Sequence, residues 1–469
     1  MNLVPRLTSF AACVLTLVGT TATADDKPSV KRPNVLFLFA DDMRADSIAA
    51  LGNPAIRTPN LDGLVSRGFV FRNAYCLGGN SPAVCTPSRN MLLSGKAFFR
   101  WQGLLAPGDA PNFPLSMRDA GYQTYHHGKK GNTATNIQAR FEIDKYVNEN
   151  VERTSGEPGR LVVDDAIAFL RERPNDRPFF MYLAFGNPHD PRVAAEKYLN
   201  QYDRDRLPLP KNFRPLHPFD NGEMIVRDEK LAAWPRTESE IRRHIHEYNA
   251  VMTAFDFHIG RLLRTLAELK LDDNTIMIFS ADQGIALGSH GLMGKQNLYD
   301  AAMKSPLVFA GPGIPSGRSD ALVYLLDIYP TVCDLVGAAM PFGLDGRSFQ
   351  PVLDGKSKAA RSDLFLAYRQ VQRAWRDERW KIIRYPQVNV TQLFDLETDP
   401  DEMHNLAGEP SQAERVQRML AKLRDSQTSF GDTQPLTVDN PQPAAWTPPA
   451  TGEAEDSKSS RKKKASGSL

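Results

Sequence analysis

Three continuous apolar runs stand out in the hydrophobic pattern of this chain. They cover residues 34–40, 179–185 and 275–281, and polar residues follow each run directly. Runs without polar alternation are typical of strands that are buried on both faces of a parallel sheet. Between the last two runs, apolar residues recur at steps of three and four over 241–269, which predicts a long helix with one buried face. The pattern therefore predicts an α/β fold built around central parallel strands.

The pattern changes after about residue 345. Short segments at 364–368, 374–376 and 380–385 predict a small antiparallel sheet. We expect a helix over 411–423 to cover this sheet. From residue 431 the chain is rich in Pro, Thr and Ser and ends in a basic cluster, so a disordered tail is predicted there.

The first residues read as a secretory signal peptide. Arg6 precedes an apolar run at 10–18, and Ala22-Thr23-Ala24 is a suitable cleavage site. The run is too short to span a bilayer, and no later segment is long enough to do so. We therefore expect a secreted or periplasmic protein with no membrane span. The expected parts are a signal peptide at 1–24, a catalytic domain at 33–345, a small-sheet subdomain at 346–430 and a tail at 431–469.

Composition narrows the class of protein. The chain has 469 residues, of which 24% are charged, and a net charge of +2 with both signs mixed along its length. Such a balance is typical of a folded globular protein and argues against a dedicated surface for nucleic acid or membrane. Beyond the leader only Cys76, Cys85 and Cys333 remain, too few for a disulfide framework. Cys76 and Cys333 either pair or stay as separate buried thiols.

Polar residues follow the apolar runs at the places where open α/β sheets bind ligands. Asp41 and Asp42 follow the first run, His189 lies in the loop after the second, and Asp282 and Gln283 follow the third. Adjacent carboxylates repel each other unless a cation lies between them, although a solvated turn would also accommodate them. A histidine titrates near neutral pH, which suits a general acid. As a lone loop residue His189 would more often be structural, but its place at a strand end favours a site.

The stretch from Cys85 to Gly95 reads as the start of a helix. Thr86 can cap it, Pro87 suits its first turn, and an apolar run follows. Cys85 would then lie at the positive end of a helix, where thiolates and anions are favoured. Arg89 lies one turn on and can point back at an oxyanion. The plain alternative is an ordinary helix start beside a buried cysteine.

This stretch also resembles the signature of the type I sulfatases, C-x-P-S-R-x-x-x-L-S/T-G, at every fixed position. The resemblance extends over roughly residues 33–406, and the stretch from Gly288 to Gln296 looks most like the iduronate-2-sulfatase and choline-sulfatase-like bacterial branches. It implies the alkaline-phosphatase-like α/β sandwich of that family, with a large mixed, mostly parallel sheet and a small C-terminal antiparallel sheet. It also implies that Cys85 is oxidised to formylglycine, whose hydrate is the nucleophile, by a formylglycine-generating enzyme.

The same resemblance assigns roles to further residues. A divalent cation would be held by the all-oxygen set of Asp41, Asp42, Asp282 and Gln283. Oxygen ligands suit Ca²⁺ first and Mg²⁺ second, whereas zinc would call for more His or Cys. Arg89 and Lys129 would hold the formylglycine and the sulfate, and His189 or Lys295 would protonate the leaving alcohol.

The chain departs from the family pattern after Lys129. The family typically continues with Trp-His, but this chain has Lys130 and Gly131. Either His126 or His127 supplies an imidazole from upstream, or this branch works without it; a strand edge would also explain both histidines. His127 and His290 are candidate substrate contacts. On spacing alone, a flexible glycine-rich loop with solvated polar residues is the better explanation of Lys295 and His290. The irregular segment 196–234 is expected to cross the mouth of the site and to select the substrate.

The resemblance implies hydrolysis of a sulfate ester, with a sulfated carbohydrate as the expected substrate. Two other classes remain open. Relatives with the same cysteine motif cleave phosphorus esters, so a phosphodiester or phosphonate monoester hydrolase is one alternative. The missing histidine after Lys129 leaves a non-catalytic protein that binds sulfated glycans as the other.

Overall fold

The computed structural model describes Met1, residues 32–101 and residues 111–449, and the chain from Pro33 onwards forms one compact unit. Apart from Met1, the expected signal peptide at 1–24 lies outside the described residues, as does the end of the expected tail at 450–469. Among the described residues, no helix combines the length and the apolar character that crossing a membrane requires.

A large mixed sheet forms the centre of this unit. Its strands run in the order β10-β2-β9-β7-β1-β6-β4-β5, and β8 pairs with β2. The bounds are β1 (Asn34–Ala40), β2 (Phe69–Tyr75), β4 (Gln123–Gly128), β5 (Ile143–Tyr146), β6 (Phe179–Ala184), β7 (Thr275–Ala281), β8 (Lys304–Ser305), β9 (Leu307–Ala310) and β10 (Gly317–Tyr324). β1 pairs in parallel with β6 and β7, whereas β9 runs antiparallel to both its neighbours. The prediction that the three apolar runs form central parallel strands is confirmed.

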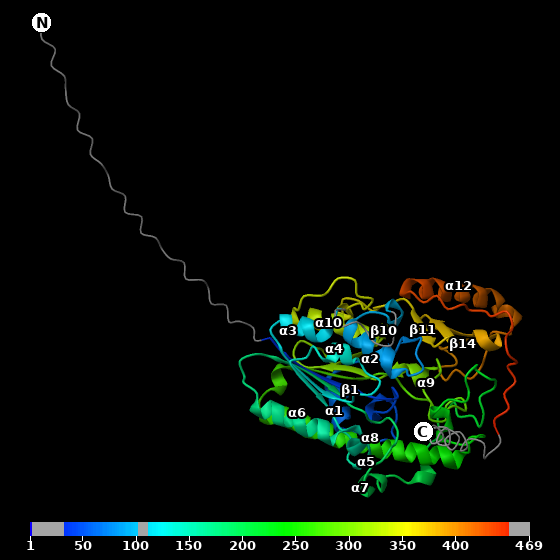
Figure 1. The fold of residues 1–469 in the computed structure, drawn as a ribbon, viewed down its shortest axis with the longest axis horizontal. Helices are drawn as coiled ribbons and strands as arrows, with labels where there is room; N and C mark the ends of the chain where they lie inside the picture. The colour runs from blue at the N-terminus through cyan, green and yellow to red at the C-terminus, as the bar shows by residue number, and fades with distance from the viewer. Residues whose placement is uncertain (2–31, 102–110, 450–469) are drawn as a thin grey trace, which may run out of the picture. The chain divides into compact units, whose positions relative to one another are not determined.

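Helices cover both faces of this sheet (Figure 1). Their bounds are α1 (Pro59–Arg67), α2 (Cys85–Ser94), α3 (Phe113–Asp119), α4 (Thr135–Gln138), α5 (Glu149–Thr154), α6 (Arg160–Glu172), α7 (Glu196–Leu199), α8 (Glu238–Glu268), α9 (Asp300–Met303), α10 (Ile328–Val336), α11 (Gln350–Leu353) and α12 (Ala413–Phe430). Along β1, Leu36 and Leu38 pack into one core with α1, α6 and α8, and Phe37 and Phe39 into a second core with α2, α3 and α10. Burial on both faces explains the absence of polar alternation in β1.

The long predicted helix is α8. Its side chains from Ile241 to Leu266 that recur at helical spacing are buried against the sheet and against α1 and α6. The helix begins after Thr237, whose hydroxyl accepts a hydrogen bond from the Glu240 N–H, as expected of an N-cap. The irregular segment before it contains only α7 and two short 3₁₀ turns, at 204–206 and 228–231.

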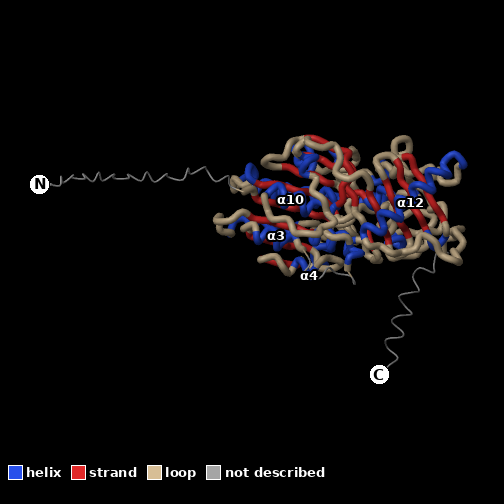
Figure 2. Tube along the Cα trace, turned by 90° about the horizontal axis from the view of Figure 1, so that it is seen from above, coloured by secondary structure: helices blue, strands red, loops and turns tan. Residues whose placement is uncertain are grey.

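The predicted small sheet is present after residue 345. It has the order β14-β13-β12-β11-β3 and is antiparallel except where β3 joins β11 in parallel. The bounds are β3 (Gly78–Gly79), β11 (Leu364–Tyr368), β12 (Gln372–Arg376), β13 (Trp380–Tyr385) and β14 (Val390–Asp395). Figure 2 shows α12 lying along these strands, as the helix predicted over 411–423 should. Because β3 comes from the N-terminal part of the chain, the two sheets are tied together just before α2.

Residues 431–449, which the composition assigns to a disordered tail, are packed against the protein. Asp432 forms an ion pair with Arg373 on β12, Leu436 is buried, and the Trp446 ring lies 6.1 Å from that of Trp234. Partners far away in the sequence supply the burial that the local composition lacks, so the packed chain extends beyond 430. Among the described residues Cys76, Cys85 and Cys333 are free, so Cys76 and Cys333 are separate buried thiols.

Candidate active site

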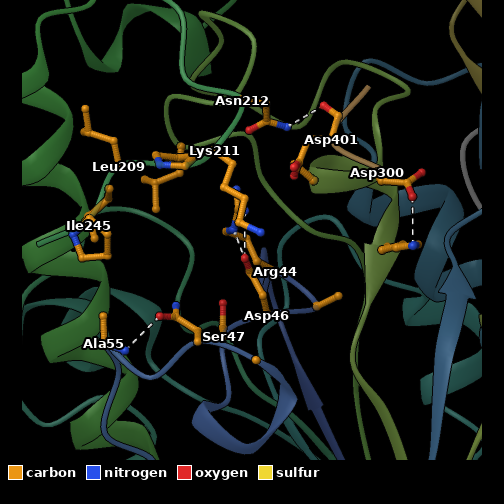
Figure 3. A pocket seen from close by; sticks show the side chains of 18 of the residues that line it. Arg44, Asp46, Ser47, Ala55, Leu209, Lys211, Asn212, Ile245, Asp300 and Asp401 are labelled. Atoms are coloured by element: carbon orange, nitrogen blue, oxygen red, sulfur yellow. Dashed lines mark hydrogen bonds and ion pairs between the residues drawn. The ribbon is translucent and has the colours of Figure 1, made fainter. Parts of the chain in front are cut away.

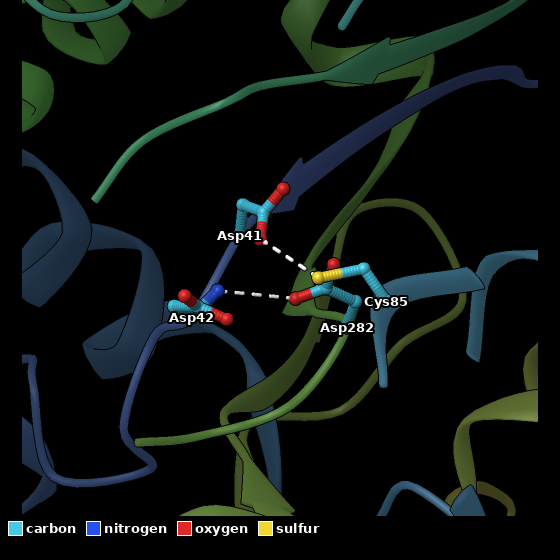
Figure 4. Close-up of side chains that lie close together, drawn as sticks. All are labelled: Asp41, Asp42, Cys85 and Asp282. Atoms are coloured by element: carbon cyan, nitrogen blue, oxygen red, sulfur yellow. Dashed lines mark hydrogen bonds between the residues drawn. The ribbon is translucent and has the colours of Figure 1, made fainter. Parts of the chain in front are cut away.

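Polar side chains from three segments meet beyond the carboxyl ends of β1 and β7. Asp41, Asp42, Cys85 and Asp282 are all buried, and each offers a ligand atom within 4.8 Å of the other three. Figure 4 shows the Cys85 sulfur facing a carboxylate oxygen of Asp41, at 3.3 Å from Oδ1. The convergence that we expect from two strand ends and a helix N-terminus is therefore present.

The backbone after β1 turns so that it presents two successive carboxylates. Asp42 has a φ of 59°, in the left-handed region that Asp tolerates better than most residues. Its N–H donates to Oδ1 of Asp282 over 3.1 Å, while the Asp282 N–H donates to the Ala40 carbonyl over 3.2 Å. The parallel pairing of β1 with β7 thus brings together carboxylates that lie 240 positions apart in the chain.

Three cationic side chains surround these carboxylates. Arg89 donates from Nε to Asp282 over 2.9 Å and from Nη2 to Asp41 over 3.2 Å. Lys129 forms an ion pair with Asp41, and Lys295 lies 2.7 Å from both carboxylate oxygens of Asp42. The site therefore holds a buried, closely balanced set of charges, in which removing one member leaves another charge unpaired.

These charges shift the pKa values of the carboxyls in opposite directions. Burial raises the pKa of Asp41, but the charges of Lys129 and Arg89 outweigh it and hold that pKa well below its ordinary value. Burial and the neighbouring charge of Asp41 raise the pKa of Asp282 to about 6. Asp282 is thus the carboxyl whose negative charge most needs a further positive charge nearby.

The oxygen donors at this place fit a hard divalent cation. The Gln283 Nε2 donates to Asp42 Oδ1 over 2.7 Å and to the Cys85 sulfur over 3.0 Å. Its Oε1 is buried and has no hydrogen-bond partner among the described residues. A buried acceptor without a donor is costly, and a cation beside the three carboxylates would satisfy it. Asp41, Asp42, Asp282 and Gln283 therefore suit an ion such as Ca²⁺ or Mg²⁺.

Cys85 is the first residue of α2, as the sequence predicts, but two local details differ. The residue before the helix is Val84, and its cap has no side-chain hydrogen bond, so Thr86 does not cap the helix. The helix end was expected to favour a thiolate. Burial and the charges of Asp282 and Asp41 instead raise the pKa of Cys85 well above its ordinary value. Near neutral pH this environment keeps the unmodified side chain as a thiol.

His189 and Lys295 lie beside the same cluster. The His189 Nε2 is 3.6 Å from Asp42 Oδ2, and the Lys295 Nζ is 3.5 Å from the Cys85 sulfur. His189 Nδ1 lies 2.8 Å from the Asp190 carbonyl oxygen, an acceptor that requires Nδ1 to carry a proton. Both candidate proton donors thus have a nitrogen close to the Asp42 carboxylate.

The other candidate histidines are His126, His127 and His290. Among the described residues, none of them has a contact with this cluster. His290 is stacked on Tyr299, with ring centroids 3.8 Å apart, and lies 3.1 Å from the Asn212 amide. His127 lies 3.6 Å from Asp165 on the α6 side of β4. His126 lies 2.7 Å from Asp144 and packs on Tyr182. Burial lowers the pKa of His290 to about 3 and that of His127 to about 4, so both are neutral core residues.

Sequence reasoning missed three charged residues at the rim of the cluster. Arg227, from the irregular segment, pairs with Asp190 and with Asp228. Asp190 follows His189 directly, and Asp228 lies 4.0 Å from the Lys295 ammonium. Asp190 lies in the loop that the sequence already singles out for His189. For Arg227 and Asp228 the signal is the lack of periodicity over 196–234, which marks a long excursion without identifying its contact residues.

A separate cavity of about 550 Å³ lies next to the loop that follows β1. Figure 3 shows Arg44 and Asp46 in its wall, with Lys211 and Ile245 across from them. Arg44 pairs with Asp46 over 2.8 Å. The cavity lining includes none of the four residues drawn in Figure 4.

Two family models match the chain. Residues 33–338 match the family described as Sulfatase. Residues 288–429 match a second model, described as the C-terminal part of N-sulphoglucosamine sulphohydrolase. The two matches together cover both sheets of the structure.

Individual proteins show the same likeness over most of the chain. An N-acetylglucosamine-6-O-sulfatase of Bacteroides thetaiotaomicron is 26% identical, over 87% of this chain and 88% of the relative. A protein whose structure was solved in complex with its substrate D-glucosamine-2-N,6-O-disulfate superimposes on this chain with a TM-score of 0.74 at 23% identity. The superposition covers 87% of this chain and 99% of that one. A phosphonate monoester hydrolase of Agrobacterium radiobacter follows with 0.73 at 21% identity, covering 85% and 96%. These two structures share the fold of this chain.

Proposed function

This chain belongs to the sulfatase family of sulfuric ester hydrolases, and from that premise we propose that it hydrolyses the sulfate ester of a carbohydrate to alcohol and inorganic sulfate. One observation carries the proposal. Cys85, at the first position of α2, lies in a buried cluster with three carboxylates, three cationic side chains and the Gln283 amide. A tetrahedral oxyanion ester needs positive charge, an activated oxygen nucleophile and a proton donor at one place.

The cation and the modified cysteine complete this site. Asp41, Asp42, Asp282 and Gln283 would hold a divalent cation, with Ca²⁺ as the first choice and Mg²⁺ as the second, and such an ion would supply positive charge for the sulfate oxygens. If Cys85 is converted to formylglycine, the hydrate of its aldehyde would supply the nucleophilic oxygen. Lys129 and Lys295 pair with Asp41 and Asp42, and each ammonium, as a compact point charge with three donors, would also contact a sulfate bound beside these carboxylates.

The proton for the leaving alcohol comes from His189 or Lys295. When the bond between sulfur and the ester oxygen breaks, its electron pair stays on that oxygen, which takes a proton from the nearby nitrogen. His189 Nε2 and Lys295 Nζ both face the Asp42 carboxylate, so both approach from the same side of the site. Arg89 stays fixed between Asp282 and Asp41, where it holds the two carboxylates in register.

The relatives described above support a sulfated sugar as the substrate. One is an N-acetylglucosamine-6-O-sulfatase, and one fold relative was solved with a disulfated glucosamine. We further propose that a signal peptide at 1–24 directs the chain to the periplasm or the exterior, and that a formylglycine-generating enzyme acts on Cys85. We also propose that residues 33–345 form the catalytic part and that the smaller sheet borders it.

A phosphorus ester is the alternative substrate. The likeness in fold to a phosphonate monoester hydrolase favours it, and the same charges would accommodate a phosphonate.

The site also lacks the histidine expected after Lys129, and no contact among the described residues brings His126 or His127 in its place. A glycan-binding role without turnover rests on that absence alone.

Release of free sulfate tests the proposal. The protein is co-expressed with a formylglycine-generating enzyme and offered sulfated mono- and polysaccharides, choline sulfate, an aryl sulfate and matching phosphorus esters. Conversion of Cys85 is checked by peptide mass, and a Cys85→Ala variant is the control. Sulfate released from a carbohydrate ester by the converted protein only is the expected result. Converted protein that cleaves only the phosphorus esters would favour the alternative, and binding without turnover would favour the glycan-binding role.

A further inference from the structure

The irregular segment before α8 contacts the edge of the site through the side chain of Arg227, which pairs with Asp190. Its guanidinium contacts two carboxylates, with Nη1 lying 3.0 Å from Asp190 Oδ1 and 2.7 Å from Asp228 Oδ1. The Arg227 side chain is 59% exposed, whereas those of Asp190 and Asp228 are 9% and 5% exposed. The arginine therefore covers two nearly buried carboxylates from the solvent side.

Asp190 connects this arginine to His189. The His189 Nδ1 lies 2.8 Å from the Asp190 carbonyl oxygen and 3.4 Å from its Oδ1. Both acceptors are on the Nδ1 side of the ring, so they hold the proton there and turn Nε2 towards Asp42. A carboxylate that is itself fixed by an arginine restricts the imidazole ring more than a mobile one would.

Asp228 connects the same arginine to Lys295. Its Oδ2 accepts a hydrogen bond from Gln296 Nε2 over 2.8 Å and lies 4.0 Å from Lys295 Nζ. The next residue, Glu229, accepts from the backbone N–H groups of Met293 and Gly294. Asp228 and Glu229 thus clamp the segment onto the loop that carries Lys295, and Arg227 joins the segment to the loop that carries His189.

We propose that Arg227 is a positioning residue that fixes the two proton donors of the site, and that the chain is built for sulfate esters of aliphatic alcohols such as sugar hydroxyls rather than for esters of phenols. This inference rests on the proposed function. An alkoxide is a far poorer leaving group than a phenolate, so only an alcohol ester needs a precisely placed acid.

As the bond between sulfur and the attacking oxygen at residue 85 forms, the bond between sulfur and the ester oxygen breaks. The ester oxygen keeps that electron pair and takes the proton that the imidazolium of His189 carries on Nε2. The attacking hydroxyl loses a proton that returns to His189, and one water is consumed in restoring the hydroxyl at residue 85, so ester and water yield alcohol and hydrogen sulfate.

Two substitutions separate this role from plain structural support. In Arg227→Met the side chain keeps its reach but loses its charge, and in Arg227→Lys the charge is retained without the fork that joins two carboxylates. Arg206→Met is the matched control, because Arg206 lies on the same segment, is 88% exposed and pairs only with Asp203 among the described residues. Each variant is assayed on 4-nitrophenyl sulfate and on the sugar sulfate that the wild type hydrolyses fastest, and its melting temperature is recorded.

We expect Arg227→Met to lower kcat on the sugar sulfate by about 10²-fold, the lower end of what general acid catalysis contributes. On 4-nitrophenyl sulfate kcat should fall by less than about threefold, KM should change little on either ester, and Arg227→Lys should recover part of the loss. An equal loss of kcat on both esters would overturn the inference. A rise in KM without a loss of kcat would also overturn it and would make Arg227 an anion-binding residue. Wild-type protein that hydrolyses neither ester refutes the proposed function itself, and this role with it.

Discussion

Replacing Asp282 by Asn isolates the charge of one carboxylate from its place in the fold. The Asp282 Oδ1 accepts the backbone N–H groups of Asp42 and Gln283 over 3.1 and 3.0 Å, and an asparagine Oδ1 can accept both. Only Oδ2, which receives the Arg89 Nε over 2.9 Å, becomes an NH₂ group that faces another donor. The turn should therefore survive while the charge balance and one cation ligand are lost.

The structure sets the size of the effect. Breaking a buried ion pair costs about 3–5 kcal/mol, and Arg89 keeps Asp41 as a partner, so we expect about 3 kcal/mol. For a folded region of roughly 400 residues, this lowers the melting temperature by about 3–4 °C. Turnover should fall by at least about 10²–10³-fold, as when a preorganised charge at a reacting oxyanion is removed.

Calcium titration gives a second readout. At a concentration about 100 times its dissociation constant, a ligand specific for the folded state stabilises it by about 2.7 kcal/mol. The wild-type melting temperature should rise with Ca²⁺ by about 3 °C, and that of Asp282→Asn should not. Asp320→Asn is the control, because Asp320 pairs with Arg72 on the surface, with 66% of its side chain exposed. Wild-type turnover and a wild-type calcium response in Asp282→Asn would refute the cation site.

Three further predictions concern the rest of the chain. Burial lowers the pKa of His217 to about 4, so neutral His217 stabilises the fold fully above pH 6.5. As the pH falls towards 4, about 3 kcal/mol of the free energy of unfolding is lost. Urea unfolding measured at both ends of this pH range should show a smaller loss in His217→Gln than in the wild type. Asp432→Asn leaves the Arg373 guanidinium, which is 1% exposed, without its anion. The free energy of unfolding should fall by about 3–5 kcal/mol. An unchanged melting temperature would contradict the packing of residues 431–449 against the protein. His290→Gln breaks the stacking on Tyr299 and should lower the melting temperature while kcat/KM stays within about threefold of the wild type; a selective rise in KM would instead support the substrate contact that the sequence predicts.

Local signals sufficed wherever one short segment carries the information. The apolar run of β1 predicts burial on both faces, and the helical spacing of α8 predicts one buried face; the strands and helix form where these patterns place them. Parallel strands share the edge at which they end, so the meeting of Asp41, Asp42 and Asp282 could also be expected. The Cys85 stretch pointed to the sulfatase family, which the family model confirms.

Contacts between distant segments could not be read in this way. His290 lies in a glycine-rich loop that suggests a flexible binding element, yet Asn212 and Tyr299 enclose it in the core. Thr86 has the side chain of a helix cap, but α2 begins before it. The proline-rich stretch after 430 is locally poor in apolar residues, and Arg373 and Trp234 nevertheless provide partners for it.

The sequence by itself determined the α/β class, the central strands, the long helix and the candidate chemistry of Cys85 with its acidic neighbours. These follow from periodicity and from residue types whose preferences act over a few positions. Only the tertiary structure decided which charges meet. Arg89 joins Asp41 to Asp282, and Arg227 pairs with both Asp190 and Asp228. Burial keeps Cys85 a thiol. The pKa of a buried group and the partner of a long side chain depend on atoms that the fold brings near, and sequence spacing does not encode those distances.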